Sequence, residues 1–181
     1  MTTTSTHLFA AVKGGDSASV QALFQQAAEL WCESGVRVAG LIERNHGLPG
    51  RTCNAGVLHD IASGTPYSIF REVVARPDSC HIDVDGAETA SKMVLDQIAD
   101  SDLIILSKFG KLEAASRGLI GAFAAAKRLR KPMLTTVSDR HMASWQRFAP
   151  DASLLEADAR VLAEWWSLIN PTCNSLGTGG N

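Results

Sequence analysis

The stretch His7-Leu-Phe-Ala-Ala-Val-Lys-Gly-Gly-Asp-Ser-Ala-Ser-Val20 decides the fold that the sequence predicts. Residues 7–12 form a short run that is apolar beyond His7, which is typical of a strand covered on both faces. Lys13, Gly14 and Gly15 end this run. Apolar residues then recur at helical spacing over 20–31, with Asp16 or Ser17 placed to cap the helix. The sequence therefore predicts a strand, a glycine turn and an amphipathic helix in succession.

The same alternation continues outward from this stretch. Further strands are predicted at 36–42, 102–106 and 133–137, and further helices at about 86–99, 113–130, 142–148 and 152–169. Within 45–77, candidate strands at 57–61 and 67–74 flank Ser63-Gly64-Thr65, which indicates a β-hairpin insertion after the second strand. This order predicts a three-layer α/β fold, a mostly parallel sheet with helices on both faces.

Length and composition favour one domain. The chain has 181 residues, 45% of them hydrophobic, and we expect a single α/β domain over 7–169 followed by a flexible tail over 170–181. The formal charge of −2 excludes long nucleic acid as a partner. Met1–Thr6 has no signal-peptide features. The sequence also contains no run of about 18 apolar residues, which a membrane-spanning helix needs, so we expect a cytoplasmic protein.

Three loops are candidates for function because ligands collect at the carboxyl ends of parallel strands. These loops are Lys13–Ser17, Ser107–Glu113 and Ser138–His141. In the first, the backbone amides of Gly14, Gly15 and Ser17 stand at a helix N-terminus, where an anion is favoured, and Lys13 adds a positive charge. The loop lacks the G-x-x-x-x-G-K-[ST] pattern of a phosphate-binding loop, so a plain glycine turn capped by Asp16 is the alternative.

The second loop concentrates positive charge. Lys108, Gly110 and Lys111 follow an apolar strand, with Glu113 and Arg117 just beyond. From Lys108 to Lys131 the chain carries seven Lys or Arg residues against one Glu. We therefore predict a cationic site for a small anionic ligand at this strand end, with Ser138 from the third loop lining the same pocket.

Four stretches carry a resemblance to a known family: Gly35–Arg44, Leu58–Gly64, Cys80–Asp83 and Lys108-Phe-Gly-Lys-Leu-Glu113. They resemble an uncharacterised bacterial domain family whose members are associated with molybdenum ABC-transporter genes. More distantly, the element order resembles P-loop nucleoside-triphosphatases that insert a β-hairpin after the second strand. The resemblance implies a nucleotide-type fold and a link to molybdenum transport or cofactor proteins.

The resemblance also has departures that bear on activity. The similar enzymes end the third sheet strand with Asp-Glu, where the Asp serves Mg²⁺, whereas this chain has Ser107-Lys108. A lysine there repels Mg²⁺ and argues against efficient hydrolysis. We therefore predict binding of a nucleotide phosphate or a small oxyanion such as molybdate, without efficient hydrolysis. Glu113 is the catalytic candidate if the protein is instead a nucleoside-triphosphatase with altered motifs.

Two alternatives of other classes stay open. Cys53, His59, Cys80 and His81, with His46 nearby, bring soft and imidazole ligands that suit a metal ion, or a thiol pair that responds to oxidation, although their spacing is irregular. An interaction subunit with a vestigial pocket is the other alternative.

A homodimer is a separate hypothesis. Adjacent residues on a helix point about 100° apart, so one of Trp165 and Trp166 is expected to be partly exposed and to help form such an interface.

Overall fold

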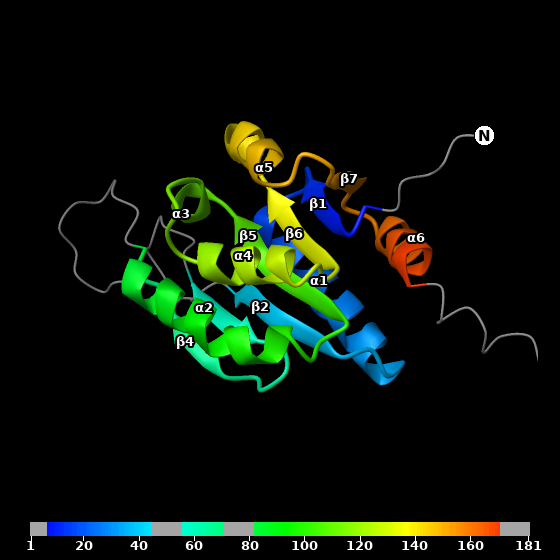
Figure 1. The fold of residues 1–181 in the computed structure, drawn as a ribbon, viewed down its shortest axis with the longest axis horizontal. Coiled ribbons are helices and arrows are strands. Elements are labelled where there is room, and N and C mark those ends of the chain that lie inside the picture. The colour runs from blue at the N-terminus through cyan, green and yellow to red at the C-terminus, as the bar shows by residue number, and fades with distance from the viewer. Residues whose placement is uncertain (1–6, 45–55, 71–81, 171–181) are drawn as a thin grey trace, which may run out of the picture.

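The computed structural model describes residues 7–44, 56–70 and 82–170. Their strands are β1 (Phe9–Lys13), β2 (Val38–Arg44), β3 (Val57–Asp60), β4 (Pro66–Ser68), β5 (Leu103–Phe109), β6 (Met133–Val137) and β7 (Ser153–Glu156). Their helices are α1 (Ser17–Glu33), α2 (Val84–Ile98), α3 (Lys111–Ala114), α4 (Ile120–Arg128), the 3-10 turn η1 (Asp139–His141), α5 (Met142–Phe148) and α6 (Ala159–Ile169). Strands and helices alternate along the chain, as the sequence predicts (Figure 1).

The described strands form one seven-stranded sheet in the order β4-β3-β2-β5-β6-β1-β7. From β2 to β7 every neighbouring pair is parallel, whereas β3 runs antiparallel to both β2 and β4. The mostly parallel sheet and the hairpin after the second strand are therefore confirmed.

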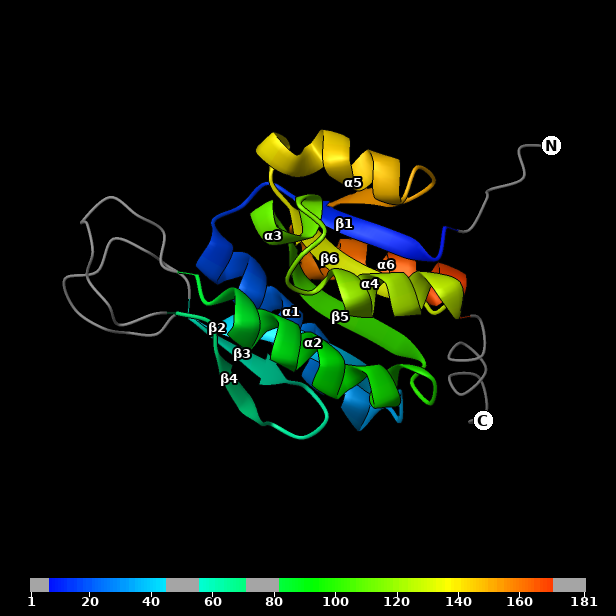
Figure 2. The ribbon, with the colours of Figure 1, turned by 60° about the vertical axis from the view of Figure 1, so that its left-hand side comes forward.

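Two apolar cores lie on opposite faces of the sheet, because successive residues of each buried strand point to opposite sides. Leu103 and Ile105 of β5 pack with α1 and α6, whereas Ile104 and Leu106 pack with α2, α4 and α5. Figure 2 shows α2 and α4 on one side of the strands and α1 and α6 on the other. This arrangement is the predicted three-layer architecture.

One predicted helix is two in the structure. The predicted helix 113–130 is interrupted between α3 and α4, where Ser116 and Gly118 both have a positive φ. The carboxylate of Glu113 accepts a hydrogen bond from the amide of Leu119 and holds this turn. The interruption places α3 at the end of β5, separate from the helix that covers the sheet.

The predicted start of the last helix is also wrong. Residues 153–156 form β7, which pairs in parallel with β1 and becomes the edge of the sheet, and Asp158 then caps α6 by accepting from the amide of Arg160. Pairing with the edge of β1 satisfies backbone groups that a helix would otherwise satisfy internally.

The expectation of an exposed tryptophan is wrong too. Trp165 and Trp166 are both buried, and Trp166 lies beside Trp31 of α1 with ring centroids 5.8 Å apart. The homodimer hypothesis therefore loses the residues on which it rested. The predicted tail after 170 and the predicted strand residues 71–74 lie outside the described residues.

Candidate functional site

Three predicted loops follow neighbouring strands. β5, β6 and β1 are adjacent and parallel, so their carboxyl ends share one edge of the sheet. Figure 1 shows α3 and α5 beyond the same ends of β5 and β6. The structure therefore brings the β1–α1 turn, the β5–α3 turn and Ser138 to one edge, where ligands collect in open α/β sheets.

The β1–α1 turn depends on two left-handed residues. Gly14 and Gly15 have φ values of +76° and +77°, which L side chains rarely adopt. Asp16 then caps α1: its carboxylate accepts from the Ser19 amide at 3.0 Å and from the Ser19 hydroxyl. These hydrogen bonds hold the pKa of Asp16 below its ordinary value. The prediction that Asp16 caps the helix is thus confirmed. The backbone amides from Gly14 to Ser17 stay the candidates for anion binding.

The end of β5 is tied to α1 and β2 through Ser107. Its buried hydroxyl accepts from the Glu43 amide at 3.0 Å and donates to the side-chain carbonyl of Gln21. The next residue, Lys108, turns its ammonium to the carboxylate of Glu43 at 3.4 Å. A lysine and a buried glutamate therefore join the ends of two neighbouring strands.

Glu113 has a backbone role in the structure. Its two carboxylate oxygens accept from the amides of Gly110 and Leu119, each at 2.9 Å. Burial raises the pKa of Glu113, and these hydrogen bonds oppose that shift. The carboxylate thus closes the turn after β5, whereas its predicted part in orienting lysines, a water or catalysis stays a prediction.

The other predicted ligand residues differ in placement. Lys111 lies exposed on α3, and Ser138 lies exposed before η1. The ammonium of Lys13 lies 3.8 Å from Glu156 at the end of β7. Arg117 pairs with Glu88 of α2 at 2.5 Å. Arg117 is therefore held toward α2, away from the pairing of Lys108 with Glu43.

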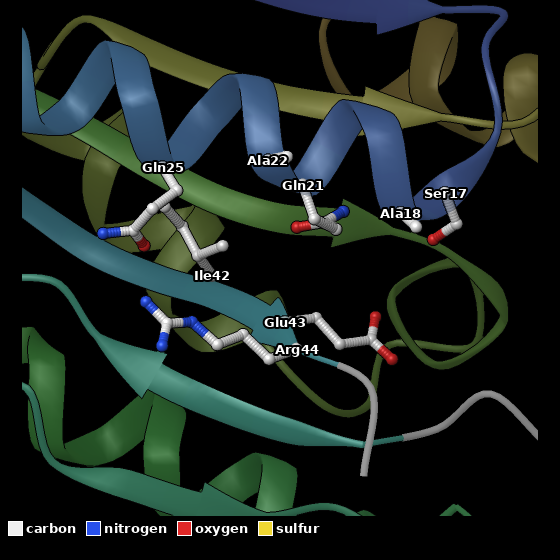
Figure 3. Close-up of a pocket in the computed structure, with 8 residues that line it drawn as sticks. All are labelled: Ser17, Ala18, Gln21, Ala22, Gln25, Ile42, Glu43 and Arg44. Carbon is white, nitrogen blue, oxygen red and sulfur yellow. The ribbon is translucent and has the colours of Figure 1, made fainter. Parts of the chain in front are cut away.

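A pocket of about 340 Å³ lies between the first turns of α1 and the end of β2 (Figure 3). It is lined by Ser17, Ala18, Gln21, Ala22, Gln25, Ile42, Glu43 and Arg44. Of these residues, Ser17 alone belongs to the site predicted from the sequence. Two polar residues at otherwise buried positions were the available signal: Gln21 beside Val20, and Glu43 directly after Ile42.

Of the residues predicted for a metal or redox site, His59 lies among the described residues. His46, Cys53, Cys80 and His81 lie outside the described residues. His59 lies half-buried on β3 opposite Ile42, and burial, followed by the charge of Arg44, lowers its pKa. Over 7–44, 56–70 and 82–170, no three or more His, Cys, Asp or Glu residues are grouped so that they could hold a metal ion. The Cys/His site therefore stays a hypothesis.

None of the helices in the described part of the chain is both long and apolar enough to cross a lipid bilayer.

Comparison with known proteins gives one informative relative. The chain is 33% identical over 136 residues to the molybdenum import ATP-binding protein ModC 2 of Bradyrhizobium diazoefficiens. The match covers 74% of this chain but only 15% of that protein's length. No solved structure matches the chain significantly. A family described as a protein of unknown function, DUF2478, matches residues 9–165, and the chain therefore belongs to this family.

Proposed function

We propose that this protein binds a nucleotide phosphate or another small oxyanion at the carboxyl edge of the sheet, without efficient hydrolysis. In this proposal the amides of the turn from Gly14 to Ser17 bind the anion, and Lys108 and Lys111 neutralise it. The observation that carries the proposal is the sheet order β5-β6-β1, which puts the glycine turn and the two lysines at one edge. The similarity to a protein named as ATP-binding supports a P-loop-like relationship.

The chemistry of the β5 end supports binding over hydrolysis. Magnesium takes oxygen ligands, and phosphoryl transfer depends on the charge it neutralises. Lys108 instead brings an ammonium, its partner Glu43 is engaged by it at 3.4 Å, and both oxygens of Glu113 are engaged by amides. These residues do not fit a magnesium ion, whereas a lysine that reaches solvent can neutralise an anion directly.

Calorimetric titration with ATP, GTP, phosphate and molybdate tests the proposal. We expect at least one of these anions to bind, and Lys108→Ala to weaken that binding roughly 10-fold or more, because a hydrogen bond to a charged group contributes about 1.5–3 kcal/mol. Lys92→Ala is the matched control, since Lys92 is an exposed lysine of α2. Absence of heat with all four anions, or equal effects of the two variants, contradicts the proposal.

The name of the relative makes molybdate the oxyanion to test beside phosphate. The relative is named for molybdenum import, which supports a link between this chain and molybdenum transport or cofactor proteins. Molybdate is a tetrahedral oxyanion like phosphate, so backbone amides and lysines can bind both in the same way. Competition between molybdate and ATP in the calorimeter tests this form of the proposal, because one shared site requires each to displace the other.

A further inference from the structure

The pocket beside α1 is larger than an inorganic anion needs. Its volume is about 340 Å³. A water molecule takes about 30 Å³ of liquid, so a tetrahedral anion with four oxygens needs roughly 100 Å³. Sites for organic ligands begin at about 300 Å³. Ser17 lies both at the pocket wall and in the proposed anion-binding turn, so a ligand with its anion at that turn can extend into the pocket.

Part of the pocket wall suits an uncharged group. Polar and charged residues line the rest, namely Ser17, Gln21, Gln25, Glu43 and Arg44. Ala18 and Ala22 line the apolar part from α1, and Ile42 lines it from β2 (Figure 3). An oxyanion gains nothing from these methyl groups, because moving it against them removes water without providing hydrogen bonds. The organic part of a larger ligand gains from the same contact through burial of apolar area.

Gln21 also lines the pocket and carries a buried hydrogen-bond donor. The residue is only 8% exposed, and its side-chain NH₂ has no hydrogen-bond partner among the described residues. Ser107 explains the orientation of the amide: its hydroxyl oxygen accepts from Glu43, so its one proton is donated to the carbonyl of Gln21. The NH₂ group is thus left for another acceptor, and leaving a buried donor unmet is unfavourable.

We propose that this pocket holds the uncharged organic part of a phosphate ester, and that Gln21 donates to a hydroxyl, carbonyl or ring nitrogen of that part. The ligand is then a nucleotide rather than a bare oxyanion. This inference rests on the proposed function, because it assigns the anionic end of the same ligand to the turn from Gly14 to Ser17.

The test compares the four common ribonucleoside triphosphates with inorganic tripolyphosphate by calorimetry. These ligands share the triphosphate group, and only the nucleotides carry the organic part. We expect at least one nucleotide to bind 10-fold or more tightly than tripolyphosphate. If every nucleotide binds no better than tripolyphosphate, the inference is overturned while the proposed function stands. If neither class binds, the inference is overturned, and the proposed function fails with it unless phosphate or molybdate binds.

Two pairs of variants locate the preference. Ala22→Leu fills the pocket, and Ala124→Leu is its control at an exposed position of α4. Gln21→Met removes the donor, and Gln26→Met is its control at an exposed position of α1. We expect only Ala22→Leu and Gln21→Met to reduce the ratio of nucleotide to tripolyphosphate affinity, by 5-fold or more. An unchanged ratio in a folded Ala22→Leu protein places the organic part elsewhere and overturns the inference.

Discussion

The carboxylate of Glu43 and the ammonium of Lys108 lie 3.4 Å apart and join the ends of β2 and β5. Their surroundings differ: the Glu43 side chain is 8% exposed and the Lys108 side chain 48% exposed. The carboxylate is therefore fixed inside the protein while the ammonium reaches solvent. An incoming anion can approach Lys108 from the solvent side, but it must compete with Glu43 for the same charge.

This competition predicts that Glu43→Gln strengthens anion binding. Glutamine keeps the size of the side chain and removes the negative charge that opposes the ligand and engages Lys108. We expect the dissociation constant for tripolyphosphate to fall roughly 2- to 10-fold, which corresponds to about 0.5–1.5 kcal/mol. Calorimetry measures the change, with Glu164→Gln, an exposed position of α6, as the control. Weaker binding in Glu43→Gln would show that the glutamate supports the site.

Anion binding is also predicted to be independent of magnesium. Lys108 supplies a permanent positive charge at the end of β5, and the residues around it do not fit a magnesium ion. We expect ATP to bind with the same or a lower dissociation constant in EDTA than in excess Mg²⁺. A dissociation constant that is 10-fold lower in Mg²⁺ than in EDTA would instead indicate an ordinary metal-assisted phosphate site.

Gly118 is predicted to be essential for the turn that Glu113 closes. A Cβ added at Gly118 would lie 2.6 Å from a carboxylate oxygen of Glu113, and the residue has a φ of +62°. Gly118→Ala is therefore expected to lower the free energy of unfolding by about 1–3 kcal/mol. Urea denaturation measures this change.

Ser116 in the same turn provides the contrast. It has a φ of +60° with a side chain present. Ser116→Gly therefore removes the steric cost of a side chain in this left-handed conformation. We expect this variant to be neutral or more stable than the wild type in the same denaturation experiment. Equal destabilisation by both variants would show that the left-handed turn does not explain the effect at Gly118.

The ion pair between Arg37 and Asp102 is predicted to make stability depend on pH. The Arg37 guanidinium donates to both oxygens of Asp102 at 3.1 and 2.8 Å and thereby lowers the pKa of this carboxyl. A lowered folded-state pKa stabilises the fold above the unfolded-state pKa of about 3.9, and this stabilisation is lost as the pH falls.

Asp102→Asn should therefore lower stability most above about pH 5, where the carboxyl is charged in both states. The difference from wild type should shrink steadily as the pH is lowered toward the folded-state pKa. Thermal or urea unfolding over this pH range measures it. A difference that stays constant with pH would mean that the charge of Asp102 does not contribute.

The alternation of apolar runs was enough to predict most of the fold. The strand at 133–137 is β6 with the same bounds, and the helix at 142–148 is α5. The exceptions depended on distant partners. Residues 153–156 became a strand because β1 offered an edge for pairing, and the helix predicted at 113–130 was divided by a bond from the Leu119 amide to Glu113. Neither partner is visible in a local pattern.

The candidate site was predicted only at the level of its loops. The glycine turn and Lys108 became candidates because each lies directly after a predicted strand. The pocket was missed because residues of α1 and of β2, which are not adjacent in the sequence, form it only when the two elements pack together. The role of Lys108 likewise depends on Glu43 of a neighbouring strand. Such contacts depend on which elements become neighbours in the fold, and local residue patterns do not show this.

A crystal structure of the protein with ATP, or with molybdate, tests the central claim most directly. We expect an anion that accepts hydrogen bonds from amides of the turn between Gly14 and Ser17 and lies within ion-pair distance of Lys108. An anion bound at another part of the protein under saturating conditions, with this turn and Lys108 unoccupied, would contradict the account.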